Sequence, residues 1–475
     1  MKLNSDIVYL KEEEIMGILP TKNTEFEKIK AYSTYKVLLN KKLRALTKNN
    51  KDYWSFKGNS YREYGHGLFQ YPAMMVPQVI QAIINNIIDI YPKIKTISDP
   101  FVGSGTVMTE TMLRGLSFFG NDINPLAILL CQVKSGPFFI EKLKKKSNTL
   151  MNRIKIDNKT NYEVNFDNKA KWFTKSTLIY LSKIRRSIKK ERDIWARRFF
   201  WIVLAETIIL TSNSRTSTYK LHIRTKEDIC ERGDNIDISQ IFNKILTRNI
   251  LEYTNLCNKL NENKLLRDGY YKHGLQIDFL DAKDIKKVSK ANIIFTSPPY
   301  GDNNTTVPYG QHSYLPLQWI DFSDIDSKIE RNILLKTSNE IDYRSLGGQK
   351  KITKEDKLQI IQKSNNLNKF IKSLKRKQKD KINKVIAFFR DLDQCIDPIL
   401  QSLRNNGIMV WVLGNRRVGG KQVPLDKILS DFFKKRNVSV FCKLSRNIPS
   451  KRMASRNNIT KTMSSETILI MCKDK

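Results

Sequence analysis

Residues 292–300 read Asn-Ile-Ile-Phe-Thr-Ser-Pro-Pro-Tyr, an apolar run that passes directly into a rigid polar corner. The apolar residues favour a buried strand, and the two prolines fix φ and remove two backbone donors. Pro298 also biases the residue before it toward an extended conformation. We therefore expect a hydroxyl, a free carbonyl and an aromatic ring at the end of a strand, in a pocket suited to a flat amine; the residues concerned are Ser297, Pro298, Pro299 and Tyr300.

A second motif lies upstream, where residues 95–106 read Lys-Thr-Ile-Ser-Asp-Pro-Phe-Val-Gly-Ser-Gly-Thr and a helix-like segment follows. A strand, a glycine turn and a helix bring backbone N–H groups toward a ligand at the helix N-terminus. A Rossmann dinucleotide site is the alternative, although the third glycine of that fingerprint is missing. The next predicted strand, 117–122, ends in Asp122. A carboxylate at this offset meets ribose hydroxyls in a doubly wound sheet, and helix capping is its other possible role.

Taken together, these motifs resemble those of the amino-group DNA methyltransferases, which methylate exocyclic amines with S-adenosylmethionine. In that family Ser-Pro-Pro-Tyr mostly accompanies cytosine N4, whereas Asp-Pro-Pro-Tyr or Asn-Pro-Pro-Tyr mostly accompanies adenine N6. The resemblance implies an α/β fold, a seven-stranded doubly wound sheet whose last strand runs antiparallel, here with large, mainly helical insertions. It also implies cofactor contacts from the glycine turn, from two later acids and from a segment before a helix predicted to begin at Pro77; the candidates are Phe69, Tyr71, Pro72, Asp99, Phe101, Gly103, Ser104, Gly105, Thr106, Asp122, Ile123 and Asp281.

The hypothesis for the chemistry is that a cytosine swings out of double-stranded DNA and enters the Ser-Pro-Pro-Tyr pocket. Ser297 and the Pro298 carbonyl would accept its two N–H bonds, and Tyr300 would stack on the base. Three alternatives stay open: an adenine N6 methyltransferase, an enzyme that modifies RNA, and a basic nucleic-acid-binding scaffold without catalysis. The role implied by the resemblance is host-DNA protection, paired with a cognate restriction endonuclease.

Charge independently favours a polyanionic partner, because 84 Lys and Arg oppose 47 Asp and Glu in 475 residues, a formal charge of +37. An anionic membrane is the competitor, yet no apolar run approaches the length of a membrane span, and the first residues lack a signal-peptide core. We expect a cytoplasmic, nucleoid-associated protein of a prokaryote. The 6 cysteines and 4 histidines are dispersed, so we expect neither a metal site nor a disulfide framework.

The predicted organisation is a catalytic domain interrupted by insertions. An N-terminal extension covers 1–60, and the catalytic domain comprises 61–130, 272–323 and 385–475. A helical insertion at 131–271 is the expected DNA-contacting or target-recognition region, and 324–384 forms a second basic insertion. Cations in the first insertion and after two late strands are candidate DNA contacts; they are Arg215, Lys220, Arg224, Arg416, Arg446, Lys451 and Arg452.

Overall fold

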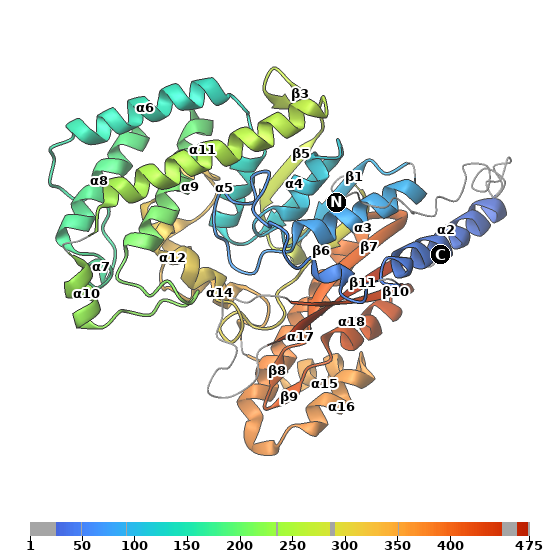
Figure 1. Ribbon diagram of the computed structural model, residues 1–475. Helices are drawn as coiled ribbons and strands as arrows, with labels where there is room; N and C mark the ends of the chain where they lie inside the picture. Colours follow the sequence, from blue (N-terminus) through green and yellow to red (C-terminus); the bar gives the residue numbers. More distant parts are fainter. Residues whose placement is uncertain are drawn as a thin grey trace.

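The computed structural model describes residues 25–48, 50–91, 93–233, 236–285, 290–349, 351–448 and 463–473. Its centre is a seven-stranded sheet in the order β10-β11-β7-β6-β1-β2-β5 (Figure 1). Strand β11 runs antiparallel to both of its neighbours, whereas the pairs from β7 to β5 are parallel. This confirms the predicted fold. The strands are β1 (Thr96–Asp99), β2 (Ser117–Asp122), β5 (Leu275–Phe279), β6 (Ala291–Thr296), β7 (Leu403–Gly414), β10 (Val438–Asn447) and β11 (Ser465–Lys473).

The register of the central strands brings the sequence motifs to one edge. Ile97 of β1 lies opposite Phe118 of β2 and Ile293 of β6. Because these strands are parallel, their carboxyl ends meet at the same edge, where open α/β sheets hold ligands. Asp99, Asp122 and Thr296 are the last residues of the three strands.

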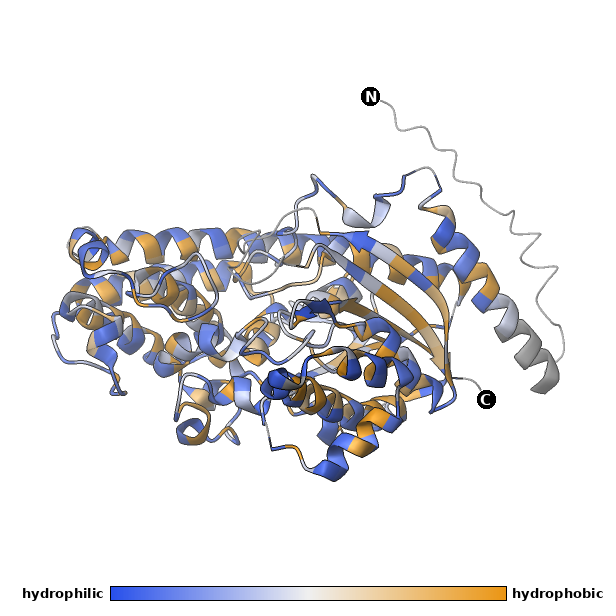
Figure 2. Ribbon diagram, turned by 90° about the horizontal axis from the view of Figure 1, so that it is seen from below, coloured by the Kyte–Doolittle hydropathy of each residue, from blue (hydrophilic) through white to orange (hydrophobic). Residues whose placement is uncertain are grey.

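Both faces of the sheet are buried, as the continuous apolar strands require. Alternate residues of β6 serve the two faces: Ile293 and Phe295 belong to one core cluster, and Ile294 belongs to the other. The strands are correspondingly hydrophobic in Figure 2, while the helices around them carry mixed faces. The flanking helices are α2 (Glu25–Ala45), α3 (Pro77–Ile90), α4 (Thr106–Met112), α5 (Pro125–Lys134), α17 (Lys379–Gln401) and α18 (Leu425–Lys434), with η1 (Tyr53–Ser55) beside β10.

The chain between α5 and β5 forms a helical layer (Figure 1). Its central helix, α9 (Ile194–Thr211), is apolar almost all round and packs against α8, α11, α5 and α12. A helix with this pattern is stable only when it is buried. The other elements are α6 (Ile140–Ile156), α7 (Lys169–Trp172), α8 (Lys175–Lys189), α10 (Lys226–Gly233), α11 (Ile238–Glu262), β3 (Leu266–Arg267) and β4 (Tyr270–Tyr271).

The short helix η2 (Ala282–Asp284) precedes β6, and further short helices follow β6. They are α12 (Tyr309–Trp319), η3 (Phe322–Asp324), α13 (Arg331–Leu334), α14 (Glu340–Arg344), α15 (Lys354–Gln362), α16 (Asn365–Ser373) and η4 (Arg376–Gln378), with the hairpin β8 (Arg417–Val418) and β9 (Lys421–Gln422). Helices α15 and α16 and the hairpin lie at the lower end of the molecule in Figure 1. Among the described residues, no helix is long and apolar enough to cross a bilayer. The same part of the chain contains no group of three or more His, Cys, Asp or Glu side chains arranged to hold a metal ion.

Candidate active site

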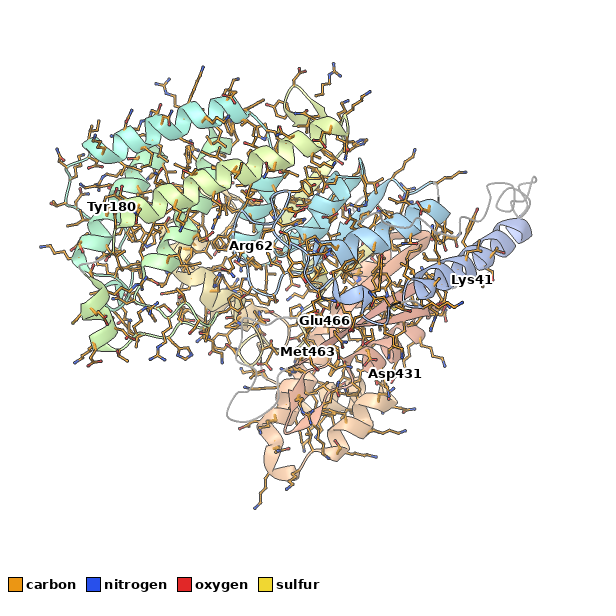
Figure 3. The ribbon with its side chains drawn as sticks, in the orientation of Figure 1. Lys41, Arg62, Tyr180, Asp431, Met463 and Glu466 are labelled. Carbon is orange, nitrogen blue, oxygen red and sulfur yellow. The ribbon has the colours of Figure 1, made fainter. Side chains whose placement is uncertain are left out.

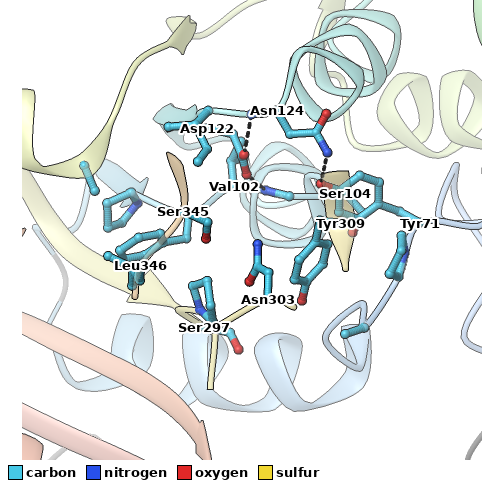
Figure 4. A pocket seen from close by; sticks show the side chains of 18 of the residues that line it. Tyr71, Val102, Ser104, Asp122, Asn124, Ser297, Asn303, Tyr309, Ser345 and Leu346 are labelled. Atoms are coloured by element: carbon cyan, nitrogen blue, oxygen red, sulfur yellow. Dashed lines mark hydrogen bonds between the residues drawn. The ribbon is translucent and has the colours of Figure 1, made fainter. Parts of the chain in front are cut away.

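A cavity opens at the shared carboxyl edge of β1, β2 and β6, and aromatic, apolar and polar side chains from several segments line it. Figure 4 shows Asp122 and Asn124 at one side of this cavity and Ser297 and Asn303 at the other. Residues of the Ser-Pro-Pro-Tyr tetrapeptide and of the glycine turn therefore share one cavity. The predicted residues that line it are Tyr71, Pro72, Phe101, Gly103, Ser104, Thr106, Asp122, Ile123, Asp281, Ser297 and Pro299.

The glycine turn is held in shape from both sides. Gly105 is the N-cap of α4 at φ 72°, and a Cβ there would lie 2.8 Å from the Cys131 sulfur. Lys134 is buried beneath the turn, where its Nζ donates to the Ser104 carbonyl at 2.8 Å. Burial lowers the pKa of Lys134 to about 8. Gly105 therefore packs against the Cys131 and Lys134 side chains and does not line the cavity.

Asp122 carries the negative charge of the cavity wall. One of its oxygens accepts from the Gly103 N–H at 2.9 Å, and the other accepts from the Asn124 N–H at 2.9 Å. Burial raises the pKa of Asp122 to about 6. Since each carboxylate oxygen has a second lone pair, both can still accept from ligand hydroxyls.

Asp99 lies behind the cavity wall and joins the two motifs. Its Oδ1 accepts from the Thr296 hydroxyl at 2.6 Å and from the Phe101 N–H at 3.0 Å. The other oxygen is buried with no hydrogen-bond partner among the described residues. Burial raises the pKa of Asp99 to about 7. The prediction placed Asp99 at the cofactor; the structure gives it a linking position instead.

The tetrapeptide divides its residues between the cavity and the sheet. Ser297 and Pro299 line the cavity, while Pro298 is buried. The Tyr300 hydroxyl lies 3.0 Å from the Ser297 Oγ and donates to Glu466 at 2.9 Å. Burial raises the pKa of Tyr300 well above its usual range. Tyr300 is therefore joined to the cavity through Ser297.

The segment before α3 contributes only part of what was predicted for it. Tyr71 stacks on Tyr309 with ring centroids 5.7 Å apart, and its hydroxyl accepts from Asn124 at 3.0 Å. Phe69 does not line the main cavity, because its ring is buried against His312 of α12 at 6.0 Å. The prediction for Phe69 as a direct cofactor contact therefore does not match its placement.

Sequence reasoning missed several cavity residues, namely Asn303, Tyr309, Arg344, Ser345 and Leu346. Asn303 is buried, and its amide nitrogen donates to Asp342 at 3.1 Å. Asp342 also accepts from the N–H groups of Gly310 and Gln311 at 2.9 and 3.1 Å. Within the described chain, the Asn303 Oδ1 has no hydrogen-bond partner. The only signal in the sequence was the polar loop after Tyr300, which did not single out Asn303.

The predicted DNA contacts divide into surface and internal groups. Arg215 is exposed, and Lys220 and Arg224 are half-buried, in a segment that lies against α12 through a Leu221 N–H bond to the Gln311 side chain at 3.2 Å. Arg215 and Lys220 line a second cavity, which also includes Phe69 and His312. The placement of these three cations is compatible with a contact to DNA.

Two other candidates are internal. Arg416 packs on Gly301 and bonds Asp302 and Thr305 at 3.0 and 2.8 Å. Arg446 is 7% exposed, forms an ion pair with Glu466 and donates to the Trp54 carbonyl at 3.1 Å. Both guanidinium groups form ion pairs within the protein, and DNA contact by either residue stays a prediction. Lys451 and Arg452 lie outside the described residues.

Comparisons with known proteins agree with this site. Residues 81–384 match the family model described as D12 class N6 adenine-specific DNA methyltransferase. The chain is 31% identical to Type II methyltransferase M.MvaI of Kocuria varians, across 90% of this chain and 96% of that protein. It is 34% identical to Type II methyltransferase M.MjaII of Methanocaldococcus jannaschii across 19% of this chain and 16% of that protein. The chain therefore belongs to this family of DNA methyltransferases, whose members use S-adenosylmethionine.

Proposed function

We propose that this chain methylates the exocyclic N4 amine of a cytosine swung out of double-stranded DNA. The observation that carries the proposal is that Ser297 and Asp122 line the same cavity, which joins an amine-binding corner to a cofactor turn. The serine at the first position of the tetrapeptide supports cytosine. The description of the matching family supports adenine N6 as a second candidate, and it favours that base over cytosine.

The residues present fit S-adenosylmethionine. Gly103 presents backbone to the cavity, and Asp122 has lone pairs left for ribose hydroxyls. We assign the cofactor contacts to the lining residues Tyr71, Phe101, Gly103, Asp122 and Asp281. When bound, the cofactor supplies a methyl group already activated by its sulfonium.

The chain's own contribution is to position the amine. Its lone pair is delocalised into the ring, so acceptors that hold the two N–H groups favour the tetrahedral nitrogen that attacks. Ser297 and the Pro298 carbonyl take these roles, and the Asn303 Oδ1, which has no hydrogen-bond partner among the described residues, is a further acceptor. Tyr300 is not among the residues that line the cavity, and its hydroxyl contacts the Ser297 Oγ at 3.0 Å, so we assign it to holding Ser297 rather than to stacking on the base. Positioning supplies much of the rate, and a strong base is not needed because alkylation makes the amine proton acidic.

DNA binding is assigned to the basic surface, with the insertion at 131–271 as the recognition region and 324–384 as a phosphate-binding tract. Arg215, Lys220 and Arg224 support this assignment by their surface positions. The similarity to proteins named Type II methyltransferases supports a pairing with a cognate restriction endonuclease, acting at the nucleoid of a prokaryotic cell.

The test uses Ser297→Ala and Tyr300→Ala with labelled cofactor and duplex DNA. Both variants should lose methylation and keep cofactor binding in calorimetry, because neither side chain belongs to the glycine turn. Val37→Ala, at an exposed side chain of α2, is the control and should keep full turnover. Normal turnover in both site variants would defeat the assignment of the tetrapeptide.

A further inference from the structure

We propose that Glu466 on β11 is a positioning residue, which sets the direction of the hydrogen bonds at Ser297 and leaves the serine oxygen purely an acceptor toward the target amine. The inference deepens the proposed function and rests on it. Its basis is a continuous chain of contacts: Ser297 Oγ lies 3.0 Å from the Tyr300 hydroxyl, and that hydroxyl lies 2.9 Å from the Glu466 carboxylate. Figure 3 shows Glu466 near the centre of the molecule.

The direction of this chain follows from counting hydrogens. A carboxylate can only accept, so the single hydrogen of the Tyr300 hydroxyl points to Glu466. The contact between Ser297 and Tyr300 then needs the serine hydrogen, because the tyrosine has none left. Ser297 lines the cavity. Toward a nucleobase in the cavity, the Ser297 side chain can therefore only accept hydrogen bonds, through the remaining lone pairs on its oxygen.

Arg446 anchors the far end of the chain. It lies directly opposite Glu466 across the β10–β11 pair and forms an ion pair with the second carboxylate oxygen. Arg446 is buried and is also held by the Trp54 carbonyl at 3.1 Å. The ion pair occupies the second carboxylate oxygen, and the first is left to accept from the Tyr300 hydroxyl.

Gly414 provides the space for this arrangement. It is the residue of β7 opposite Glu466, and a Cβ there would lie 2.4 Å from the Tyr300 ring. The tyrosine therefore sits in a slot formed by the absence of a side chain, with its hydroxyl directed at β11. Residues of β7, β10 and β11 thus hold one hydroxyl together.

Such an arrangement matters chemically because a serine hydroxyl can either donate or accept a hydrogen bond. A hydroxyl that is free to rotate can donate to the amine nitrogen and occupy the lone pair that must attack. A hydroxyl whose hydrogen is already used can only accept an N–H bond. The hydrogen bonds that join Ser297 to Glu466 prevent the serine hydroxyl from donating to the amine nitrogen.

Glu466→Gln should reverse the direction of these hydrogen bonds with little change in the shape of the side chain. Arg446 needs an acceptor, so it takes the amide oxygen, and the amide NH₂ then faces Tyr300. The tyrosine hydrogen turns to Ser297, and the serine hydrogen turns to the cavity. We expect kcat to fall about tenfold or more, while KM for DNA and the cofactor Kd change less than about twofold, since neither binding surface is altered.

Tyr300→Phe tests the same chain from its middle, because it keeps the ring and removes the hydroxyl. Its kcat should also fall, and adding Glu466→Gln to it should cause no further loss, since the two residues act through one contact. This variant also stands in if Glu466→Gln fails to fold. Asp393→Asn is the control, at a buried carboxylate of α17 paired with Arg436 at 2.9 Å, and it should keep the wild-type kcat.

Three outcomes overturn the proposal: a wild-type kcat in Glu466→Gln, a wild-type kcat in Tyr300→Phe, or additive losses in the double variant. Each leaves the proposed function standing if the wild-type protein methylates DNA and Ser297→Ala does not. A wild-type protein that methylates no amine defeats the proposed function itself. The two failures are therefore distinguishable.

Discussion

Asp99→Asn is a direct test of the buried carboxyl that links the glycine turn to the catalytic strand. The substitution keeps an oxygen to accept from Thr296 and Phe101, at the present distances of 2.6 and 3.0 Å. It replaces the oxygen that has no hydrogen-bond partner among the described residues. The shape of the site is preserved, and the group that titrates is removed.

The magnitude follows from the raised pKa. Burial raises the pKa of Asp99 to about 7 in the folded protein, whereas the usual pKa of an aspartyl group is 3.8. The stability that Asp99 contributes is thus complete below the unfolded pKa and is lost as pH rises through the folded pKa. Between pH 5 and 8 the wild type should lose about 3 kcal/mol through this group, at 1.36 kcal/mol per pKa unit. Asp99→Asn should not suffer this loss.

The assay is thermal or urea unfolding of wild type and variant at pH 5, 6, 7 and 8. The stability of Asp99→Asn relative to wild type should rise across this series and level off above pH 7. Asp268→Asn changes a carboxylate that is 91% exposed in the β3–β4 turn, and it should show no such trend. A relative stability of Asp99→Asn that is flat or falls with pH would refute the reasoning.

Other predictions concern the turn, the loop and the basic surface. Gly105→Ala puts a Cβ 2.8 Å from the Cys131 sulfur at a residue with φ 72°. It should cost about 2 kcal/mol of stability and weaken cofactor binding in calorimetry. Adding Cys131→Ala should recover part of both losses. Asn303→Ala should lower kcat/KM about tenfold with an unchanged fold by circular dichroism; unaltered kinetics would exclude this acceptor. Arg215→Ala and Lys220→Ala should each reduce the slope of log Kd against log salt by about 1, measured by fluorescence anisotropy, whereas an unchanged slope would remove that cation from the interface.

Local patterns explain why the sheet could be predicted. Each strand reads as an apolar run, and a turn, an acid or a diproline corner follows at its carboxyl end. Parallel pairing then brings Asp99, Asp122 and Ser297 to one edge without further information. The fold and part of the cavity lining follow from these local signals.

Partners that come from distant parts of the chain escaped prediction. Glu466 reaches Tyr300 across 166 residues, and Asp342 holds Asn303 across 39. No spacing rule connects such pairs, because only the folded sheet and the path of a loop bring them together. The same reason explains Arg446: a cation after a strand resembles a surface charge until its partner on the neighbouring strand is known.

The most direct test of the central claim identifies the nucleoside that receives the methyl group. Purified protein is incubated with duplex DNA and S-adenosylmethionine carrying a deuterated methyl group, and the digested nucleosides are separated by mass spectrometry. The account predicts labelled N4-methylcytosine, absent with Ser297→Ala. Labelled N6-methyladenine would correct the base and keep the amine chemistry. No labelled nucleoside, or a label on a ring carbon, would contradict the account.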